Sequence, residues 1–208
     1  MLAPGAARLV GPVAVGLAAV LAVLAFVPPS RGVVGGAVVA VLAALGLFLL
    51  IFFRDPERVP GEGVVSAADG RVRAVERLDD RWVISVFLSP LDVHVNRLPL
   101  DATVEAVESS GRGFRPAYRP DASENVQRRY RLRTELGPVE VVQITGIVAR
   151  RLVSFVRPGT VGRKGERFGM IVLGSRTDVL LPADRVVPTV RVGDRVRGGA
   201  STIARVVP

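Results

Sequence analysis

Three side chains far apart in the sequence could act together as a nucleophile with its base: Ser175, His94 and Asp69. Ser175 follows Gly174, and this pair separates two apolar, strand-like runs. A glycine and a hydroxyl at such a position indicate a β-bulge or tight turn, or else a peptide bond that the Ser175 hydroxyl attacks at the Gly174 carbonyl. The local pattern leaves both interpretations open.

His94 is the only histidine in the chain. A lone histidine is often structural, but Asp92, His94 and Asn96 alternate with apolar residues, so an extended segment would present three polar side chains on one face. His94 could serve as both base and acid near neutral pH. Asp69 lies in a small-residue turn with Gly70, which indicates an ordinary Asp-Gly turn or a carboxylate that orients the imidazole.

The composition restricts the classes of site and partner. The chain has 208 residues, no cysteine and a net charge of +9, carried almost wholly by arginine. The lack of cysteine excludes disulfides, thiolate metal sites and cysteine nucleophiles, and we expect no metal. A basic surface suits nucleic acid or an anionic membrane, but aromatic residues are sparse and are not interleaved with the arginines, so we expect no nucleic-acid binding.

The N-terminal part predicts a membrane anchor. Two apolar stretches, residues 9–27 and 32–53, are separated by a short linker that contains two prolines. We expect residues 1–53 to form a helical hairpin that spans the bilayer or lies in one leaflet. Arg8 and Arg54 flank this hairpin and predict that the following domain lies on the cytoplasmic face of the cell membrane.

Residues 54–208 predict a separate, β-rich domain. Short strand-like segments follow one another between turn signals, without helical periodicity of useful length. We expect a mainly antiparallel, partly closed β-barrel or sandwich. Residues 190–206 resemble the strand and turn pattern of biotinyl and lipoyl carrier domains, although the turn at residues 181–184 has no lysine to modify.

Several motifs, taken in order, resemble the phosphatidylserine decarboxylase proenzyme family in its shorter form. They are Phe53-Arg54-Asp55-Pro56 after the apolar leader, the Ala68-Asp69-Gly70 turn, residues 87–94, residues 146–151, and Phe168-Gly169-Met170 followed by Leu173-Gly174-Ser175. Together these motifs extend over nearly the whole predicted soluble domain, and their shared order makes the resemblance far more specific than any one of them.

The resemblance implies a self-cleaving, pyruvoyl-dependent carboxy-lyase. The Ser175 hydroxyl would attack the Gly174 carbonyl, and the chain would split into residues 1–174 and 175–208, which stay associated. The cofactor would be a pyruvoyl group derived from Ser175. This ketone would form a Schiff base with phosphatidylserine, an anionic phospholipid substrate in the membrane, and loss of CO₂ would give phosphatidylethanolamine. His94 would protonate the carbon that CO₂ leaves.

One position departs from the longer members of that family. They carry a second histidine three positions beyond the first, to which the resemblance assigns self-cleavage, whereas this chain has Arg97 there. Arginine cannot act as the base. Either His94 serves both steps, or Asp69 acts through another arrangement. Arg150 and Arg151 could bind an anionic head group or form a solvated pair at the end of a strand.

Two other functions fit part of the pattern. A membrane-anchored, carrier-like β-barrel could be a binding or adaptor module without catalysis, and such a module would not be cleaved. A pyruvoyl decarboxylase for a soluble amino acid would be cleaved, but the apolar leader would then have no use. The sequence leaves the oligomeric state open, including a homo-oligomer.

Overall fold

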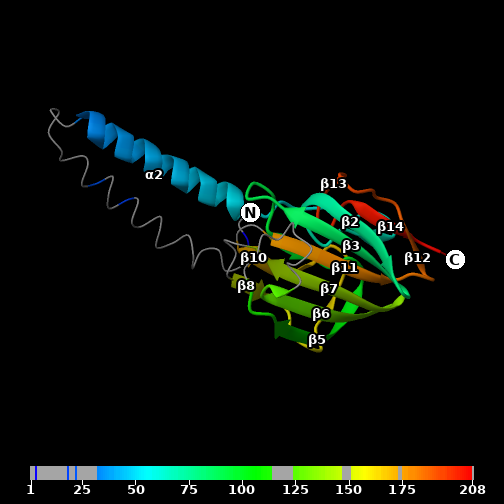
Figure 1. Ribbon diagram of the computed structural model, residues 1–208. Helices are drawn as coiled ribbons and strands as arrows, with labels where there is room; N and C mark the ends of the chain where they lie inside the picture. Colours follow the sequence, from blue (N-terminus) through cyan, green and yellow to red (C-terminus); the bar gives the residue numbers. More distant parts are fainter. Residues whose placement is uncertain are drawn as a thin grey trace. The chain divides into compact units, whose positions relative to one another are not determined.

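The computed structural model describes residues 3, 18, 22, 32–113, 124–146, 151–172 and 175–207. The chain divides into two compact units, residues 1–56 and residues 57–208. The first unit contains a long helix and the second is built from strands, so the prediction of a mainly β domain after an apolar helical segment is confirmed (Figure 1).

The helix of the first unit, α2, extends over Gly32–Phe52. Its residues from Gly35 to Phe52 have a mean hydropathy of 2.7, so the helix is long and apolar enough to cross a membrane. The other predicted apolar segment, residues 9–27, falls almost wholly outside the described residues. The helical hairpin therefore stays a prediction, whereas one apolar helix is described.

The structure describes fourteen strands, and all of them lie in the second unit. They are β1 (Val64–Val65), β2 (Gly70–Leu78), β3 (Arg81–Leu88), β4 (Val95–Arg97), β5 (Ala102–Ser110), β6 (Gln127–Thr134), β7 (Gly137–Thr145), β8 (Arg151–Ser154), β9 (Val161–Gly162), β10 (Arg167–Val172), β11 (Ser175–Pro182), β12 (Val186–Pro188), β13 (Arg195–Val196) and β14 (Thr202–Val206). This agrees with the succession of short strands that the sequence predicts for residues 54–208.

The strands form one large and two small antiparallel sheets. The large sheet has eight strands in the order β13-β2-β3-β11-β7-β6-β5-β9, and the small sheets have the orders β1-β14-β12 and β4-β10-β8. Among the described residues the large sheet is open, because its edge strands β13 and β9 do not pair with each other. A closed barrel is therefore not found, and the likeness to a carrier barrel stays a prediction.

The core lies on the inner face of the large sheet. Alternate side chains of neighbouring strands, such as Val141 of β7, Val179 of β11 and Ile84 of β3, are fully buried there. The rings of Tyr130 on β6 and Phe168 on β10 meet edge to face, with centroids 4.7 Å apart. This contact joins the large sheet to the β4-β10-β8 sheet across one hydrophobic core.

The chain changes sheets between β10 and β11. β10 ends at Val172 between β4 and β8, and β11 begins at Ser175 between β3 and β7 of the large sheet. Leu173 and Gly174 lie outside the described residues. The apolar pattern on either side of Gly174-Ser175 thus comes from two strands that belong to two different sheets.

Candidate active site

Ser175 is placed at the start of β11, in the interior of the domain. Its register partners are Leu88, the last residue of β3, and Thr145, the last residue of β7. The residue is fully buried, and its Oγ has no hydrogen-bond partner within the described part of the chain. Leaving a buried hydroxyl unsatisfied costs about 1–3 kcal/mol, so such a group is a candidate for a functional role.

His94 is buried at the same end of the large sheet as Ser175. The turn that leaves β3 after Leu88 leads to His94, whose carbonyl accepts a hydrogen bond of 3.1 Å from the backbone N–H of Ile171 on β10. The ring Nδ1 lies 2.8 Å from the Asp92 carbonyl oxygen. A carbonyl oxygen can only accept, so a neutral His94 ring carries its proton on Nδ1 and keeps Nε2 as the basic nitrogen.

Asp69 has other partners than His94. Its Oδ1 accepts from the backbone N–H of Gly198 at 2.8 Å, and its Oδ2 accepts from Arg58 Nη2 at 2.8 Å. Between described residues, no hydrogen bond joins the Asp69 carboxylate to the imidazole. The Asp92 carbonyl holds the ring instead, so a direct role of Asp69 in orienting His94 stays a prediction.

The Asp69 turn packs against the end of β3. Gly70 has a φ of 142°, and a Cβ at this position would lie 2.0 Å from the Phe87 carbonyl oxygen. Only glycine allows this approach. The close contact puts Asp69 near the row of residues that contains Ser175, and it explains why Gly follows Asp in the motif.

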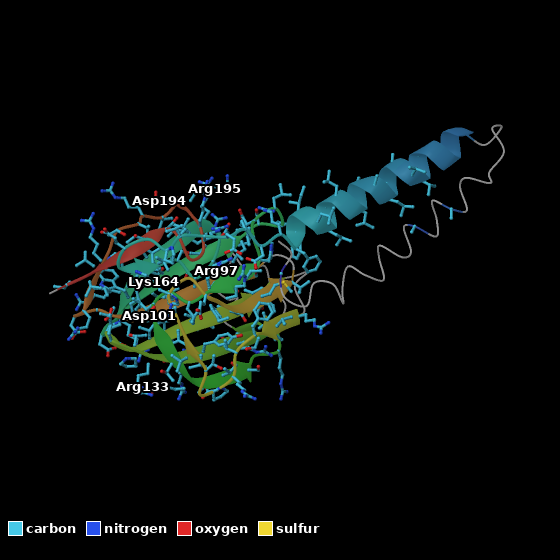
Figure 2. All side chains as sticks on the ribbon, turned by 180° about the vertical axis from the view of Figure 1, so that it is seen from behind. Arg97, Asp101, Arg133, Lys164, Asp194 and Arg195 are labelled. Atoms are coloured by element: carbon cyan, nitrogen blue, oxygen red, sulfur yellow. The ribbon has the colours of Figure 1, made fainter. Side chains whose placement is uncertain are left out.

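The arginines named by the sequence occupy different environments. Arg97, which is labelled in Figure 2, is buried on β4, and its Nη1 donates a hydrogen bond of 2.9 Å to the Gly165 carbonyl. Arg151 is exposed at the start of β8, where its register partner is Val172 of β10. Arg150 lies outside the described residues, so binding of a head group by this pair stays a prediction.

A buried chain of hydrogen bonds lies on the inner face beside Ser175. The Tyr130 hydroxyl donates to Gln143 Oε1 at 3.1 Å, and Gln143 Nε2 donates to Asn96 Oδ1 at 2.6 Å. Asn96 Nδ2 lies 3.4 Å from Thr177 Oγ1 and 3.3 Å from the Ala67 carbonyl oxygen. Thr177 follows Ser175 by two residues on β11 and points to the same face.

The polar chain contains no formal charge. Burial raises the pKa of the Tyr130 phenol above its ordinary value, although hydrogen bonds and the charge of a nearby arginine oppose this effect, so the hydroxyl stays a donor at neutral pH. A Cβ at Gly169 would lie 2.9 Å from Gln143 Nε2 and 3.1 Å from the Tyr130 hydroxyl. Glycine at position 169 therefore leaves room for the chain.

Sequence reasoning noted Asn96 but missed its partners Gln143 and Thr177. A signal was present, because Gln143 stands between Val142 and Ile144 in an otherwise apolar run. A polar side chain at a position that the alternation assigns to the core needs a buried partner. The partner itself comes from another strand and has no sequence signature.

The outer face of β11 is charged instead of neutral. Arg176 Nη2 lies 3.0 Å from Asp178 Oδ2. Burial raises the pKa of the Asp178 carboxyl above its ordinary value, although Arg176 acts in the opposite direction. The two faces of this strand therefore carry a buried hydroxyl pair, Ser175 and Thr177, and a partly buried ion pair.

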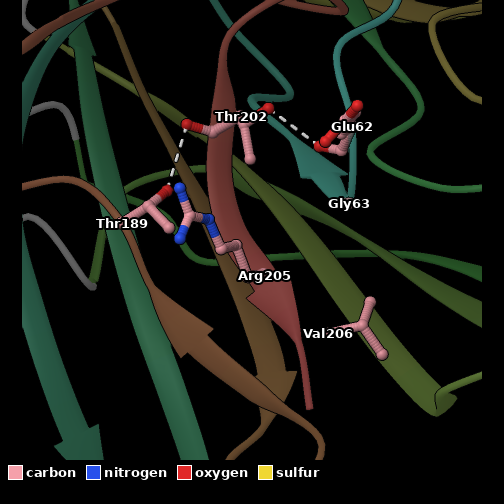
Figure 3. A pocket seen from close by; sticks show the side chains of 6 residues that line it. All are labelled: Glu62, Gly63, Thr189, Thr202, Arg205 and Val206. Carbon is pink, nitrogen blue, oxygen red and sulfur yellow. Dashed lines mark hydrogen bonds between the residues drawn. The ribbon is translucent and has the colours of Figure 1, made fainter. Parts of the chain in front are cut away.

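One hollow lies elsewhere in the domain. It has a volume of about 600 Å³ and is lined by residues of the β1-β14-β12 sheet and its loops, namely Glu62, Gly63, Thr189, Thr202, Arg205 and Val206 (Figure 3). The Thr202 hydroxyl donates a hydrogen bond of 2.8 Å to the Glu62 carbonyl, so these two polar groups of the wall are already paired with each other. This hollow includes none of the predicted catalytic residues, and we do not assign the chemistry to it. Among the described residues, no group of three or more His, Asp or Glu side chains is arranged to hold a metal ion.

Comparison with known proteins gives the family of this chain. Residues 45–204 match the family model described as phosphatidylserine decarboxylase. A phosphatidylserine decarboxylase proenzyme of Streptomyces avermitilis is 42% identical over 186 residues, which cover 88% of this chain and 86% of the relative. The proenzyme of Streptomyces coelicolor is 44% identical over 171 residues (81% and 78%), and that of Carboxydothermus hydrogenoformans is 42% identical over 173 residues (78% and 81%). The chain therefore belongs to the phosphatidylserine decarboxylase family.

Proposed function

We propose that this chain is a phosphatidylserine decarboxylase proenzyme, a carboxy-lyase that matures by cleaving itself between Gly174 and Ser175. The observation that carries the proposal is the fully buried Ser175 hydroxyl without a hydrogen-bond partner among the described residues, at the point where the chain changes sheets. The strands before and after the bond, β10 and β11, belong to different sheets, so each can keep its own backbone pairing after cleavage. Cleavage there is compatible with a domain that stays folded.

Maturation uses groups of the chain and one water molecule. The Ser175 Oγ attacks the Gly174 carbonyl carbon, a base takes the hydroxyl proton, and the peptide bond is replaced by an ester. Removal of the Ser175 α-proton then expels the Gly174 carboxylate, and water converts the resulting dehydroalanine to a pyruvoyl group with release of ammonia. His94 is our candidate for the base, because its Nδ1 is bonded to the Asp92 carbonyl and Nε2 is left basic.

The surroundings of Ser175 fit a pyruvoyl group at this position. The neighbouring inner-face side chains Thr145 and Thr177 are neutral and buried, so conversion of Ser175 to a small neutral ketone would bury no charge. When formed, this group supplies an electron-withdrawing carbonyl that reacts with the substrate amine and accepts electrons as CO₂ leaves.

The remaining roles belong to side chains around the site. His94 delivers a proton to the substrate carbon that has lost CO₂, which leads to phosphatidylethanolamine. Asp69 holds the turn beside β3 through its hydrogen bonds to Arg58 and to the backbone of Gly198. The bond to Gly198 ties this turn to the C-terminal part of the chain. Arg150 and Arg151 are candidates for contacts with the anionic head group.

The two products of cleavage would stay together. Residues 175–208 contribute β11 to β14, and β11 lies between β3 and β7 in the large sheet. β13 pairs with β2, and β14 pairs with β1, so strands of both products alternate in two sheets. The backbone ladders then hold the smaller chain after the peptide bond is broken.

The substrate is a lipid, and the N-terminal part fits this use. We propose that residues 1–53 form a membrane-anchoring helical hairpin, of which α2 is one arm, and that residues 54–208 form the catalytic domain on the cytoplasmic face of the cell membrane. A partly closed, carrier-like barrel and a homo-oligomer remain compatible with this arrangement, and no metal is needed by the chemistry.

The test is the replacement of Ser175 by alanine. We expect Ser175→Ala to give a single uncut chain on a denaturing gel and no CO₂ release from phosphatidylserine, whereas the wild type gives two chains and is active. The variant should fold, because the serine hydroxyl makes no hydrogen bond within the described residues that alanine would remove. A matched control is Ser109→Ala, which removes an exposed hydroxyl on β5 that accepts a hydrogen bond from Arg128, and which should leave cleavage intact. Cleavage or activity in Ser175→Ala would contradict the proposal.

A further inference from the structure

The end of the large sheet that carries Ser175 also carries three arginines, Arg71, Arg73 and Arg195. Arg195 of β13 pairs with Arg71 of β2, and Arg71 pairs with Phe87 of β3. The residues next to them on the inner side, Val72 and Val196, are buried, so these side chains point to the outer face. Arg73 also lies on this face, with its guanidinium carbon 5.4 Å from the centre of the Phe87 ring.

The charges on this face are segregated along the strands. The row nearest Ser175 contains Arg195, Arg71 and Arg176 and no carboxylate, whereas the third row contains Glu76 and Glu140. The arginines of other rows are paired with acids: Arg81 and Arg129 with Glu140, Arg131 with Glu108 and Arg133 with Glu105. Within the described residues, Arg71 and Arg73 have no carboxylate partner, and Arg195 has only Asp92, at 3.9 Å. Arg71, Arg73 and Arg195 therefore leave positive charge at the Ser175 end (Arg195 is labelled in Figure 2).

An apolar tip projects beside these arginines. The turn after β3 presents Pro90 and Leu91 at its apex, and Leu91 is 62% exposed. The turn is held in shape by Asp92, whose Oδ2 accepts from the backbone N–H of Ser89 at 2.8 Å and from its hydroxyl at 2.7 Å. An exposed leucine on a rigid turn can enter an apolar phase with little loss of conformational entropy.

We infer that the Pro90-Leu91 tip together with Arg71, Arg73 and Arg195 docks the catalytic unit onto an anionic lipid bilayer, with Leu91 inserted among the lipids. We call this surface the basic rim. Arginine side chains near an anionic membrane surface are attracted by its negative potential, and an apolar side chain gains by leaving water at the same place. An anionic bilayer offers both a negatively charged surface for the arginines and an apolar interior for Leu91. Nucleic acid offers only the negative charge, so the bilayer fits this surface better.

The position of the rim supports this partner. The second unit begins at Glu57, and Arg58 bonds to Asp69 in the turn that packs against the end of β3. The chain therefore enters the catalytic unit at the same end as the rim and Ser175. Docking through the rim would turn the Ser175 end toward the lipid phase, where the substrate of the proposed function resides. The inference extends that function, but its test needs no turnover.

Single-cysteine labelling tests the inference directly, because the natural chain has no cysteine. Leu91→Cys, in the full chain, is labelled with an environment-sensitive fluorophore and reconstituted into phosphatidylcholine vesicles with or without phosphatidylglycerol. The matched control is Leu78→Cys, at the opposite end of the same β2–β3 hairpin and 56% exposed. We expect the probe at position 91, and not that at position 78, to shift to the blue and to be quenched by brominated lipids, and to do so only with the anionic lipid.

Charge neutralisation and activity sharpen the test. Arg71→Gln and Arg195→Gln should each weaken the docking equilibrium about fivefold, which corresponds to the typical contribution of one basic residue at an anionic surface. Leu91→Ser should retain self-cleavage and the turnover of detergent-dispersed substrate, but lower the turnover of vesicle-borne phosphatidylserine about tenfold. Equal responses of the probes at positions 91 and 78, or shielding of position 91 without quenching by lipid, would overturn the inference whatever the enzymatic activity.

Discussion

The two ends of the large sheet differ in chemistry although the same strands build both. Along the inner face of β11, Ser175 and Thr177 at one end are followed by Val179 and Leu181 at the other. β7 shows the same change in reverse order, from apolar residues at its start to Gln143 and Thr145 at its end. One end is a polar, hydrogen-bonded site and the other is an ordinary hydrophobic core.

This difference separates stability from function. The apolar end gains free energy by removing carbon surface from water, and close packing makes each side chain there costly to shorten. The Ser175 end instead contains neutral polar groups that form hydrogen bonds with one another. It also contains the Ser175 hydroxyl, which has no hydrogen-bond partner among the described residues. Variants at the two ends should therefore fail in different ways, and the predictions below test this contrast.

The largest expected effect is on the chemistry of His94. His94→Gln should lower the rate of self-cleavage or of decarboxylation by roughly 10²–10⁴-fold, the usual contribution of a general acid or base. The two steps are followed separately, by the fraction of cut chain on a gel and by CO₂ release per cut chain. Wild-type rates of both steps in this variant would contradict a catalytic role of His94.

Next in size is the loss of packing at the apolar end. Leu181→Ala should lower the free energy of unfolding by about 2–5 kcal/mol, because Leu181 is fully buried and a cavity remains. Denaturant titration in a Ser175→Ala background keeps a single chain and so allows a two-state treatment. In the otherwise wild-type chain, the folded protein should still cut itself. Stability loss below about 1 kcal/mol would contradict this part of the comparison.

A smaller effect is expected from the buried polar chain. Gln143→Leu should cost about 1–3 kcal/mol, because the Tyr130 hydroxyl and the Asn96 carbonyl oxygen lose their partners while volume is nearly kept. It should also slow self-cleavage, since Asn96 then no longer holds Thr177 firmly. Tyr130→Phe is the matched control at the far end of the chain and should affect stability alone. Slower cleavage in both variants to the same degree would mean that the chain is only structural.

The smallest effect concerns pH and the charged outer face. Burial alone would raise the pKa of Glu140, but Arg129 and Arg81 hold it below its ordinary value of 4.5. A carboxyl with a lowered pKa contributes stability above pH 4.5 that is lost as the pH falls further. Glu140→Gln should therefore flatten the acid limb of the stability curve, by about 1 kcal/mol or less because solvent screens this pair.

Asp178 should have the opposite effect on the pH dependence of stability. Burial raises its pKa, so in the folded state it takes up a proton before it would in the unfolded chain, and this favours folding as the pH falls. Asp178→Asn should therefore make the acid limb steeper than in the wild type. Both curves are measured in the Ser175→Ala background, and equal slopes in the two variants would contradict the assignment.

Much of the fold was predictable because alternation is a local signal. β2, β3, β6 and β7 follow from period-two patterns and from turn residues such as Asp79, which has a φ of 52° in the structure. The short strands β4, β8 and β9 were not predicted as strands, because a few residues carry no period. Nor could the pattern show that the sheet is open among the described residues, since edge pairing depends on contacts between distant segments.

The site was predictable residue by residue but not as a geometry. Ser175, His94 and Asp69 could be named from their types and from the family motifs, and the burial of Ser175 and His94 agrees with their proposed roles. The partners could not be named: Arg58 and Gly198 meet Asp69 only in the folded chain, and a backbone carbonyl at Asp92 holds the imidazole. Backbone groups are the same at every position, so the sequence gives no sign of which carbonyl will do this.

The central claim, that the bond before Ser175 is cut and its serine becomes a pyruvoyl group, is tested most directly by the intact mass of the purified protein. We expect two masses, those of residues 1–174 and 175–208, with the smaller chain lighter by one ammonia than simple hydrolysis would give. A single mass of 22.1 kDa in an active preparation would contradict the account. So would a smaller chain that begins with an unmodified serine.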